Sequence, residues 1–213
     1  MAVNFFEKIQ RGWRRRESSV KGRRDPPELW RRGAVLLAMF AALGAARLAS
    51  TELSPSGEYE IKAAFLFHFS QFIDWPEGTL KGASTPLTYC TVGEDPFHGA
   101  LDASLRGKTI GARPLQVLHF KQPQYIRGCQ ILFVGAGEKA LLPAVLANLK
   151  ENAVLTVGES EHFVQNGGMI GFLLEENKIR FEINLEAAEH AKLKMSSRLL
   201  ALAKSVIGGH RGT

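Results

Sequence analysis

The chain has 213 residues and a formal net charge of +6 at pH 7, a length typical of one domain with an added tail. The positive charge is confined to the amino-terminal part. Residues 1–46 contain ten Lys or Arg and four acidic residues, whereas residues 47–213 contain 17 of each sign. A nucleic-acid-binding protein needs a basic surface against the phosphates. The balanced charge of residues 47–213 therefore argues against nucleic acid as a partner.

The amino-terminal part has the pattern of an export signal. Residues 33–46 form an apolar run of about 14 residues, shorter than the roughly 20 of a membrane-spanning helix. A basic segment before such a run predicts a signal peptide over residues 1–46, cleaved after Ala46, with cleavage after Ala49 as the less favoured alternative. Arg31-Arg32 loosely resembles a twin-arginine signal, and an uncleaved anchor is the alternative. In each case the remainder is exported. It is predicted to comprise a linker (47–57), a single domain (58–207) and a tail (208–213).

The two cysteines, Cys90 and Cys129, each lie in or beside a predicted strand. In an exported protein an isolated pair usually forms one disulfide. Closing a loop of about 40 residues would stabilise the fold by roughly 4 kcal/mol. Two free, buried thiols are the alternative. Because a disulfide joins only neighbouring positions, the bond predicts that strands 87–92 and 131–134 lie close together.

Residues 58–75 are predicted to form a helix that is apolar on nearly every side. Acidic residues occupy its first turn, where the helix dipole favours negative charge, and Pro76 ends it. Such a helix is either buried in the core or partly covered by a partner. One apolar stripe comprises Ile61, Phe65, Phe69 and Phe72, and Leu66, Phe67 and Ile73 lie on other faces.

The rest of the chain alternates between predicted strands and helices, which indicates an α/β fold with a mostly parallel sheet and helices on both faces. An antiparallel hairpin over residues 169–183 is predicted to extend one edge, and a long helical segment to follow from Leu185 to about Val206. The predicted strands are 87–92, 115–120, 130–134 and 153–157, and the predicted helices are 95–105 and 139–148.

Candidate chemistry is sparse. Gly135, Gly137 and Ala140 match the G-x-G-x-x-A pattern of dinucleotide-binding turns, with Glu159 about 20 residues further on. A tight strand-to-helix turn accounts for the same residues, and we favour it because the motif follows the third strand. The histidines lack the spacing of metal ligands, and no serine lies in G-x-S-x-G. No catalytic residue, cofactor or metal is predicted.

Several blocks of the sequence resemble the YfiR/HmsC-like periplasmic regulators. The similarity extends over about 150 residues, from 58 to 206, with the blocks in the family's order. As a set the blocks are specific, although any one alone is weak. They are residues 63–66, 72–76, 90–97, 129–134, 155–158, Phe163, 167–170, 180–184, Leu193, 196–197 and 199–200.

The resemblance implies a protein that is not an enzyme. Members resemble periplasmic repressors that bind the periplasmic sensor part of an inner-membrane diguanylate cyclase and hold down cyclic-di-GMP synthesis, exopolysaccharide and biofilm formation. It also implies release under redox or envelope stress and an outer-membrane lipoprotein as a further partner. Cys90 and Cys129 correspond to the family's disulfide pair. The second cysteine pair of some members is missing, so redox control here would rest on one bond.

Two surfaces are candidates for the partner contact. One is the aromatic helix with Phe65, Phe69, Phe72 and Trp75, and the other is the hairpin edge with Arg180. A second copy of the chain, forming a homodimer, is a further candidate partner. The alternative function is a periplasmic small-ligand binding module, with a pocket rim at the strand ends near Gly93, Gly135 and Gly158.

Overall fold

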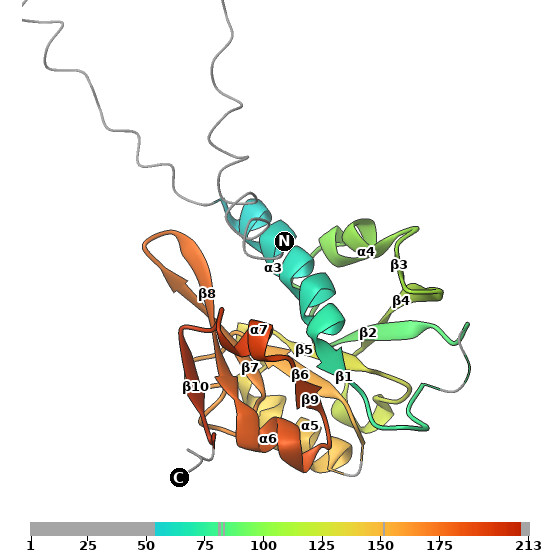
Figure 1. Cartoon of the computed structure of the whole chain (residues 1–213). Coiled ribbons are helices and arrows are strands. Elements are labelled where there is room, and N and C mark those ends of the chain that lie inside the picture. Colours follow the sequence, from blue (N-terminus) through green and yellow to red (C-terminus); the bar gives the residue numbers. More distant parts are fainter. Residues whose placement is uncertain (1–53, 81, 83, 151, 210–213) are drawn as a thin grey trace, which may run out of the picture. The chain divides into compact units, whose positions relative to one another are not determined.

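The structure is a computed structural model, and it describes residues 54–80, 82, 84–150 and 152–209 (Figure 1). The predicted signal peptide over residues 1–46 lies outside the described residues. Most of the predicted linker does too. We describe the domain that follows.

The domain is built on a mixed sheet of eight strands, most of them parallel, as predicted. Neighbouring strands β8, β7, β6, β5, β2 and β4 form its centre, with β10 at one edge and β3 at the other. Pairing is antiparallel only within β7–β8 and β3–β4. The strands are β2 (Leu87–Val92), β3 (Thr109–Ile110), β4 (Arg113–Phe120), β5 (Ile131–Val134), β6 (Leu155–Gly158), β7 (Ile170–Glu175), β8 (Lys178–Asn184) and β10 (Ser205–Ile207).

Helices cover both faces of this sheet, which confirms the predicted layers (Figure 1). Two consecutive residues of β2 point to opposite faces of the sheet. Cys90 packs in the cluster that contains Val145 of α5, whereas the hydroxyl of Tyr89 lies 2.7 Å from Ser70 Oγ, at the end of α3. The helices are α3 (Pro55–Phe69), α4 (Ala100–Leu105), α5 (Leu142–Leu149), α6 (Leu185–His190) and α7 (Ser197–Leu200), with 3₁₀ segments η2 (Ser70–Phe72), η3 (Pro123–Tyr125) and η4 (Ala136–Leu141).

The aromatic helix is shifted relative to its prediction. It begins at Pro55, inside the predicted linker, because Ser54 caps it by accepting the Gly57 N–H at 3.2 Å. It ends at Phe69, six residues before its predicted end. There the Ser70 hydroxyl donates to the carbonyl of Phe67 at 2.7 Å, and the chain continues through η2 into the short strand β1 (Ile73–Asp74).

The predicted long carboxy-terminal helix is wrong. Helix α6 ends in a Schellman motif, in which the Lys192 N–H bonds to Glu189 O and the Leu193 N–H to Ala188 O, both at 2.9 Å. Lys192 takes the left-handed position, with φ of 60°. The chain then forms β9 (Lys194–Met195), which pairs with β1, before α7 and β10. Buried side chains therefore recur along this segment without a continuous helix.

The predicted hairpin is present, but it does not form the edge of the sheet. Its turn has two residues, Glu176 and Asn177, with φ of 49° and 57°, the geometry that suits a tight reversal. Strand β10 then pairs with the outer side of β8, where Ser205 lies opposite Glu182. The free edge is therefore β10, and the backbone of β8 between Glu182 and Asn184 is not available to another chain.

Candidate functional site

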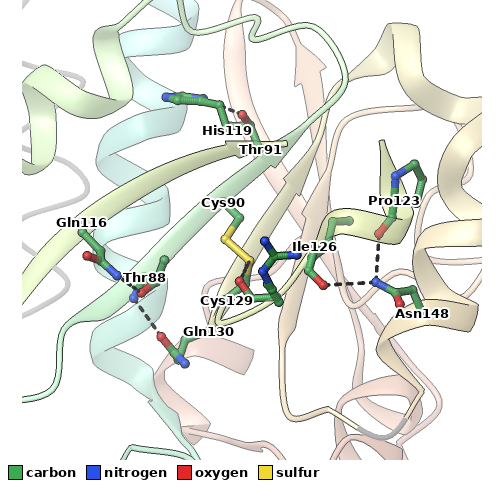
Figure 2. The surroundings of a disulfide bond; sticks show 11 residues. Thr88, Cys90, Thr91, Gln116, His119, Pro123, Ile126, Cys129, Gln130 and Asn148 are labelled. Carbon is green, nitrogen blue, oxygen red and sulfur yellow. Dashed lines mark hydrogen bonds between the residues drawn. A yellow bond between two sulfur atoms is a disulfide. The ribbon is translucent and has the colours of Figure 1, made fainter. Parts of the chain in front are cut away.

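Cys90 and Cys129 form a disulfide, as predicted, with their Cα atoms 5.9 Å apart (Figure 2). Cys90 lies within β2, and Cys129 lies two residues before β5, the parallel neighbour of β2. Both side chains are buried. The predicted adjacency of these two strands is therefore confirmed.

The loop that carries Cys129 is also held by hydrogen bonds. Asn148 of α5 donates to the carbonyl oxygens of Pro123 at 2.9 Å and Ile126 at 3.3 Å (Figure 2). The Gln130 side chain accepts the Thr88 N–H at 2.9 Å on the other side of the bond. These contacts do not depend on the disulfide. Reduction would therefore loosen the loop while leaving it attached to α5 and β2.

Two of the predicted partner-contact residues are core residues. Phe65 is 8% exposed and Phe69 is 0% exposed. The Phe69 ring stacks on Phe172 with 5.7 Å between centroids, and it meets Phe181 edge-on at 5.0 Å. Helix α3 is thus apolar because it packs on β7 and β8. Neither side chain is placed to touch a partner in this conformation, which corrects the expectation for these two positions.

Phe72 and Trp75 lie beyond the end of α3 and are half-buried. They flank β1, and the carbonyl of Phe72 accepts the Ser196 N–H at 2.9 Å. The indole N–H of Trp75 is buried, without a hydrogen-bond partner among the described residues. Phe72 and Trp75 therefore leave part of their aromatic surface accessible where η2, β1 and β9 meet.

Arg180 is exposed on β8, on the face opposite to the buried Phe181. It lies across from Leu173, close to the hairpin turn. The amino-terminal end of α3 lies at the carboxyl end of β6, where Tyr59 bonds to Glu159. Phe72 and Trp75 lie beyond the opposite, carboxy-terminal end of α3. The structure does not bring Arg180 together with the two aromatic residues.

The G-x-G-x-x-A segment forms a strand-to-3₁₀ turn where side-chain carboxylates already accept backbone N–H groups, one from this segment and one from the connection after β2. Glu159 accepts the Ala136 N–H at 3.0 Å, and Glu138 accepts the Glu94 N–H at 3.0 Å. A Cβ atom at Gly93 would lie 2.1 Å from the Glu138 side chain. The chain's own carboxylates thus occupy positions that a pyrophosphate would need. The tight-turn interpretation fits this geometry better than dinucleotide binding.

A buried ionic cluster lies at the same edge of the sheet. Lys62 of α3 bonds to the carboxylates of Glu58 and Glu159, and the Tyr59 hydroxyl donates to Glu159 at 2.9 Å. Burial, followed by the charge of Glu159, raises the pKa of Tyr59 well above its ordinary value, so the phenol stays neutral. The Glu58–Lys62 spacing is visible in the sequence. The distant Glu159 is not, because only the fold brings it here.

One polar trio was not predicted. Thr91 Oγ1 lies 2.7 Å from His119 Nδ1, and His119 Nε2 lies 3.3 Å from Asp102 Oδ2. Thr91 is buried and pairs with His119 across β2 and β4, so its hydroxyl is not placed to attack a substrate. Among the described residues there is also no group of three His, Cys, Asp or Glu arranged to hold a metal ion.

Two of the predicted pocket-rim glycines are packed against side chains. Glu138 fills the space at Gly93, and a Cβ atom at Gly158 would lie 2.3 Å from the Phe163 ring. A cavity of about 320 Å³ lies instead beside α5 and α6. Leu146, Thr156, Met169, Asn184 and His190 are among its lining residues.

These features define a disulfide-linked, doubly wound α/β domain with an internal ionic cluster. Within the described ranges, no helix has both the length and the apolar character needed to cross a bilayer. The chain belongs to the YfiR/HmsC-like family, because the family model matches residues 59–204. This confirms the resemblance drawn from the sequence blocks.

Two solved structures are distantly similar to the chain. No curated protein matches the chain. A crystal structure of a conserved domain protein from Vibrio cholerae O1 biovar El Tor strain N16961 is 10% identical, with a TM-score of 0.46 over 70% of this chain and 60% of that one. The ABC domain in complex with L-Trp from Streptococcus pneumonia is 9% identical, with a TM-score of 0.41 over 57% and 55%. The chain thus spans less than two thirds of either protein.

Proposed function

We propose that this protein is a periplasmic, non-enzymatic regulator that binds the periplasmic sensor part of an inner-membrane diguanylate cyclase. Binding represses cyclic-di-GMP synthesis and thereby biofilm and exopolysaccharide formation. The observation that carries the proposal is the family match over residues 59–204, which spans the sheet from β2 to β8 and the disulfide. A disulfide suits an exported protein, because such bonds persist in oxidising compartments.

The bond gives this regulator a candidate redox response. It lies in an apolar cluster between β2 and α5, so reduction would leave two thiols in a site packed for the bridge. The loop held by Asn148 would then be freer to move. We propose that this change lowers the affinity of the protein for the cyclase. An outer-membrane lipoprotein and a second copy of the chain are further proposed partners.

The partner surface is proposed to include Phe72, Trp75 and Arg180. Half-buried aromatic residues and arginine are the types that contribute most to binding at protein interfaces. Because the structure separates Arg180 from the aromatic pair, the surface would have to involve either two contacts on one partner or contacts to two partners. The oligomeric state and the partner count therefore bear directly on this proposal.

Affinity capture from detergent-solubilised inner membranes tests the proposal. The tagged protein should recover a membrane-bound diguanylate cyclase, and Trp75→Ala should reduce the recovery. Glu189→Gln, at an exposed position on α6, is the matched control and should leave the recovery unchanged. If wild-type protein recovers no cyclase from a membrane fraction that contains one, the proposal fails.

The cavity beside α5 and α6 favours a second candidate function, the binding of a small periplasmic ligand. Its volume of about 320 Å³ lies at the lower end of ligand-pocket sizes, and its lining combines apolar residues such as Leu146 with polar ones such as Thr156 and His190. A thermal-shift screen of metabolites tests this function. A ligand whose stabilisation is lost in Thr156→Val would support it, and the absence of any stabilising ligand would exclude it.

A further inference from the structure

A cavity of about 190 Å³ lies between the first turns of α3 and the carboxyl ends of the central strands. In open parallel sheets this edge is where bound groups are held, since the strand-to-helix connections leave room there. Its wall is polar on the α3 side and apolar on the hairpin side. The lining residues are Glu58, Tyr59, Lys62, Ala136, Glu159, Phe172, Leu173 and Leu174.

The polar side of this cavity carries an excess of negative charge. Glu58 and Glu159 contribute two carboxylates, and Lys62 contributes the single ammonium group between them. The Tyr59 hydroxyl is neutral and donates to Glu159. Lys62 and Glu159 are buried, whereas the Glu58 side chain is 21% exposed and thus accessible. An unbalanced charge in a partly dehydrated site favours a cationic guest.

The opposite side offers apolar surface that reaches the solvent. Phe172 is buried at the base, and Leu174, two residues before the hairpin turn, is 52% exposed. A lysine or arginine side chain has the matching composition, because its aliphatic stem packs on apolar surface while its cationic end reaches a carboxylate. The volume of the cavity suits one such side chain better than a larger ligand.

Exposed charges of both signs surround the cavity. Glu60 of α3, Glu161 after β6 and Glu176 in the hairpin turn are exposed, and so are Lys139 of η4 and Lys178 of β8. The preference for a cationic group therefore rests on Glu58 and Glu159 inside the cavity, where two carboxylates face one ammonium group.

We propose that this cavity is a docking pocket for a lysine or arginine side chain of a protein partner, with the cationic end paired to Glu58 and the stem against Leu174. The inference rests on the proposed function, which supplies the class of partner. It adds a contact site that is separate from Phe72 and Trp75, whereas Arg180 is the cross-strand neighbour of the lining residue Leu173. It also adds the chemistry that the partner must present.

A small probe tests the pocket without the partner. Titration of the protein with n-butylguanidinium should give saturable amide shifts at Ala136 and Leu174 in nuclear magnetic resonance spectra, and n-butyrate should give none. Glu58→Gln keeps the size of the side chain and should weaken probe binding about tenfold. Glu189→Gln, at an exposed position on α6 that does not line this cavity, is the matched control and should bind as wild type does. Equal shifts with butyrate, or unchanged affinity in Glu58→Gln, would overturn the proposal.

The partner arm separates this proposal from the proposed function. Glu58→Gln and Leu174→Asn should each weaken binding to the periplasmic segment of the cyclase about tenfold with an unchanged melting temperature. If wild type binds the cyclase and both variants bind equally well, the pocket is not a docking site. If wild type binds butylguanidinium but no cyclase, the proposed function fails and the occupant is a small organic cation, which overturns the protein-partner assignment.

Discussion

Replacement of both cysteines by alanine should destabilise the domain by about 4 kcal/mol. The bond joins residues separated by 39 positions, and the loop-entropy relation for a loop of about 40 residues gives this value at 25 °C. For a domain of this size each kcal/mol shifts the melting temperature by about 2–4 °C. The Cys90→Ala/Cys129→Ala variant should therefore melt about 8–16 °C below wild type, and wild type with a phosphine reductant should approach the same value.

Thermal melts followed by circular dichroism, with and without the reductant, measure this shift. The double variant should not respond to the reductant, which controls for effects outside the bond. Asn148→Ala is a second control, because it removes two hydrogen bonds to the same loop and should cost only about 1–3 kcal/mol. A shift below about 2 °C in both the double variant and the reduced protein would refute the view that this bond anchors the loop.

Four further changes test the core, the ionic cluster and the surface. Phe69→Ala should cost about 3–5 kcal/mol in urea unfolding, because a fully buried ring is removed; a loss below about 1 kcal/mol would contradict its place in the core. Lys62→Met should cost about 3–5 kcal/mol, because it leaves Glu159 buried without its cation, and an equally stable variant would disprove the pairing. Burial lowers the pKa of His68 from 6.5, so the unfolded state binds its proton more tightly and stability should fall as the pH drops below about 6.5. His68→Gln should reduce this dependence of stability on pH, and an unchanged dependence would mean that another group causes it. Arg180→Glu should leave stability within about 0.5 kcal/mol of wild type and weaken capture of the cyclase, whereas unchanged capture would remove Arg180 from the partner surface.

The sheet was predictable because its central strands are short apolar runs bounded by glycine, proline and polar residues. The run from Leu87 to Val92 is buried at every position, as expected of a parallel strand covered on both faces. The hairpin was visible in the alternation of Ile179, Phe181 and Ile183. In both places local sequence and tertiary packing favour the same structure.

The carboxy-terminal segment could not be predicted, because the residue that ends α6 gives no local stop signal. Helix α6 ends with Lys192 in a left-handed conformation, a position that usually holds glycine. Without that signal, the spacing of Leu193 and Leu199 is compatible with one continuous helix. The tertiary pairing of β10 with β8 decides the outcome, and it depends on residues that are distant in the sequence.

The candidate site also contains features that the sequence predicts and features that only the fold creates. The disulfide could be predicted because only two cysteines are present and export narrows their chemistry. The aromatic helix could not be divided into core and surface positions, because Phe69 and Phe72 are equally apolar. Only the packing of Phe69 on Phe172 and Phe181 distinguishes them. The pairing of Lys62 with Glu159 spans 97 positions, and no local pattern announces it.

Cellular cyclic-di-GMP measures the central claim most directly. Deletion of the gene in its native host should raise the cyclic-di-GMP level, and expression of the wild-type chain with its amino-terminal segment should restore it. The same chain without residues 1–46 should fail to restore it, since the protein would not reach the periplasm. A deletion strain whose cyclic-di-GMP level equals that of the parent, under conditions in which the protein is produced, would contradict the account.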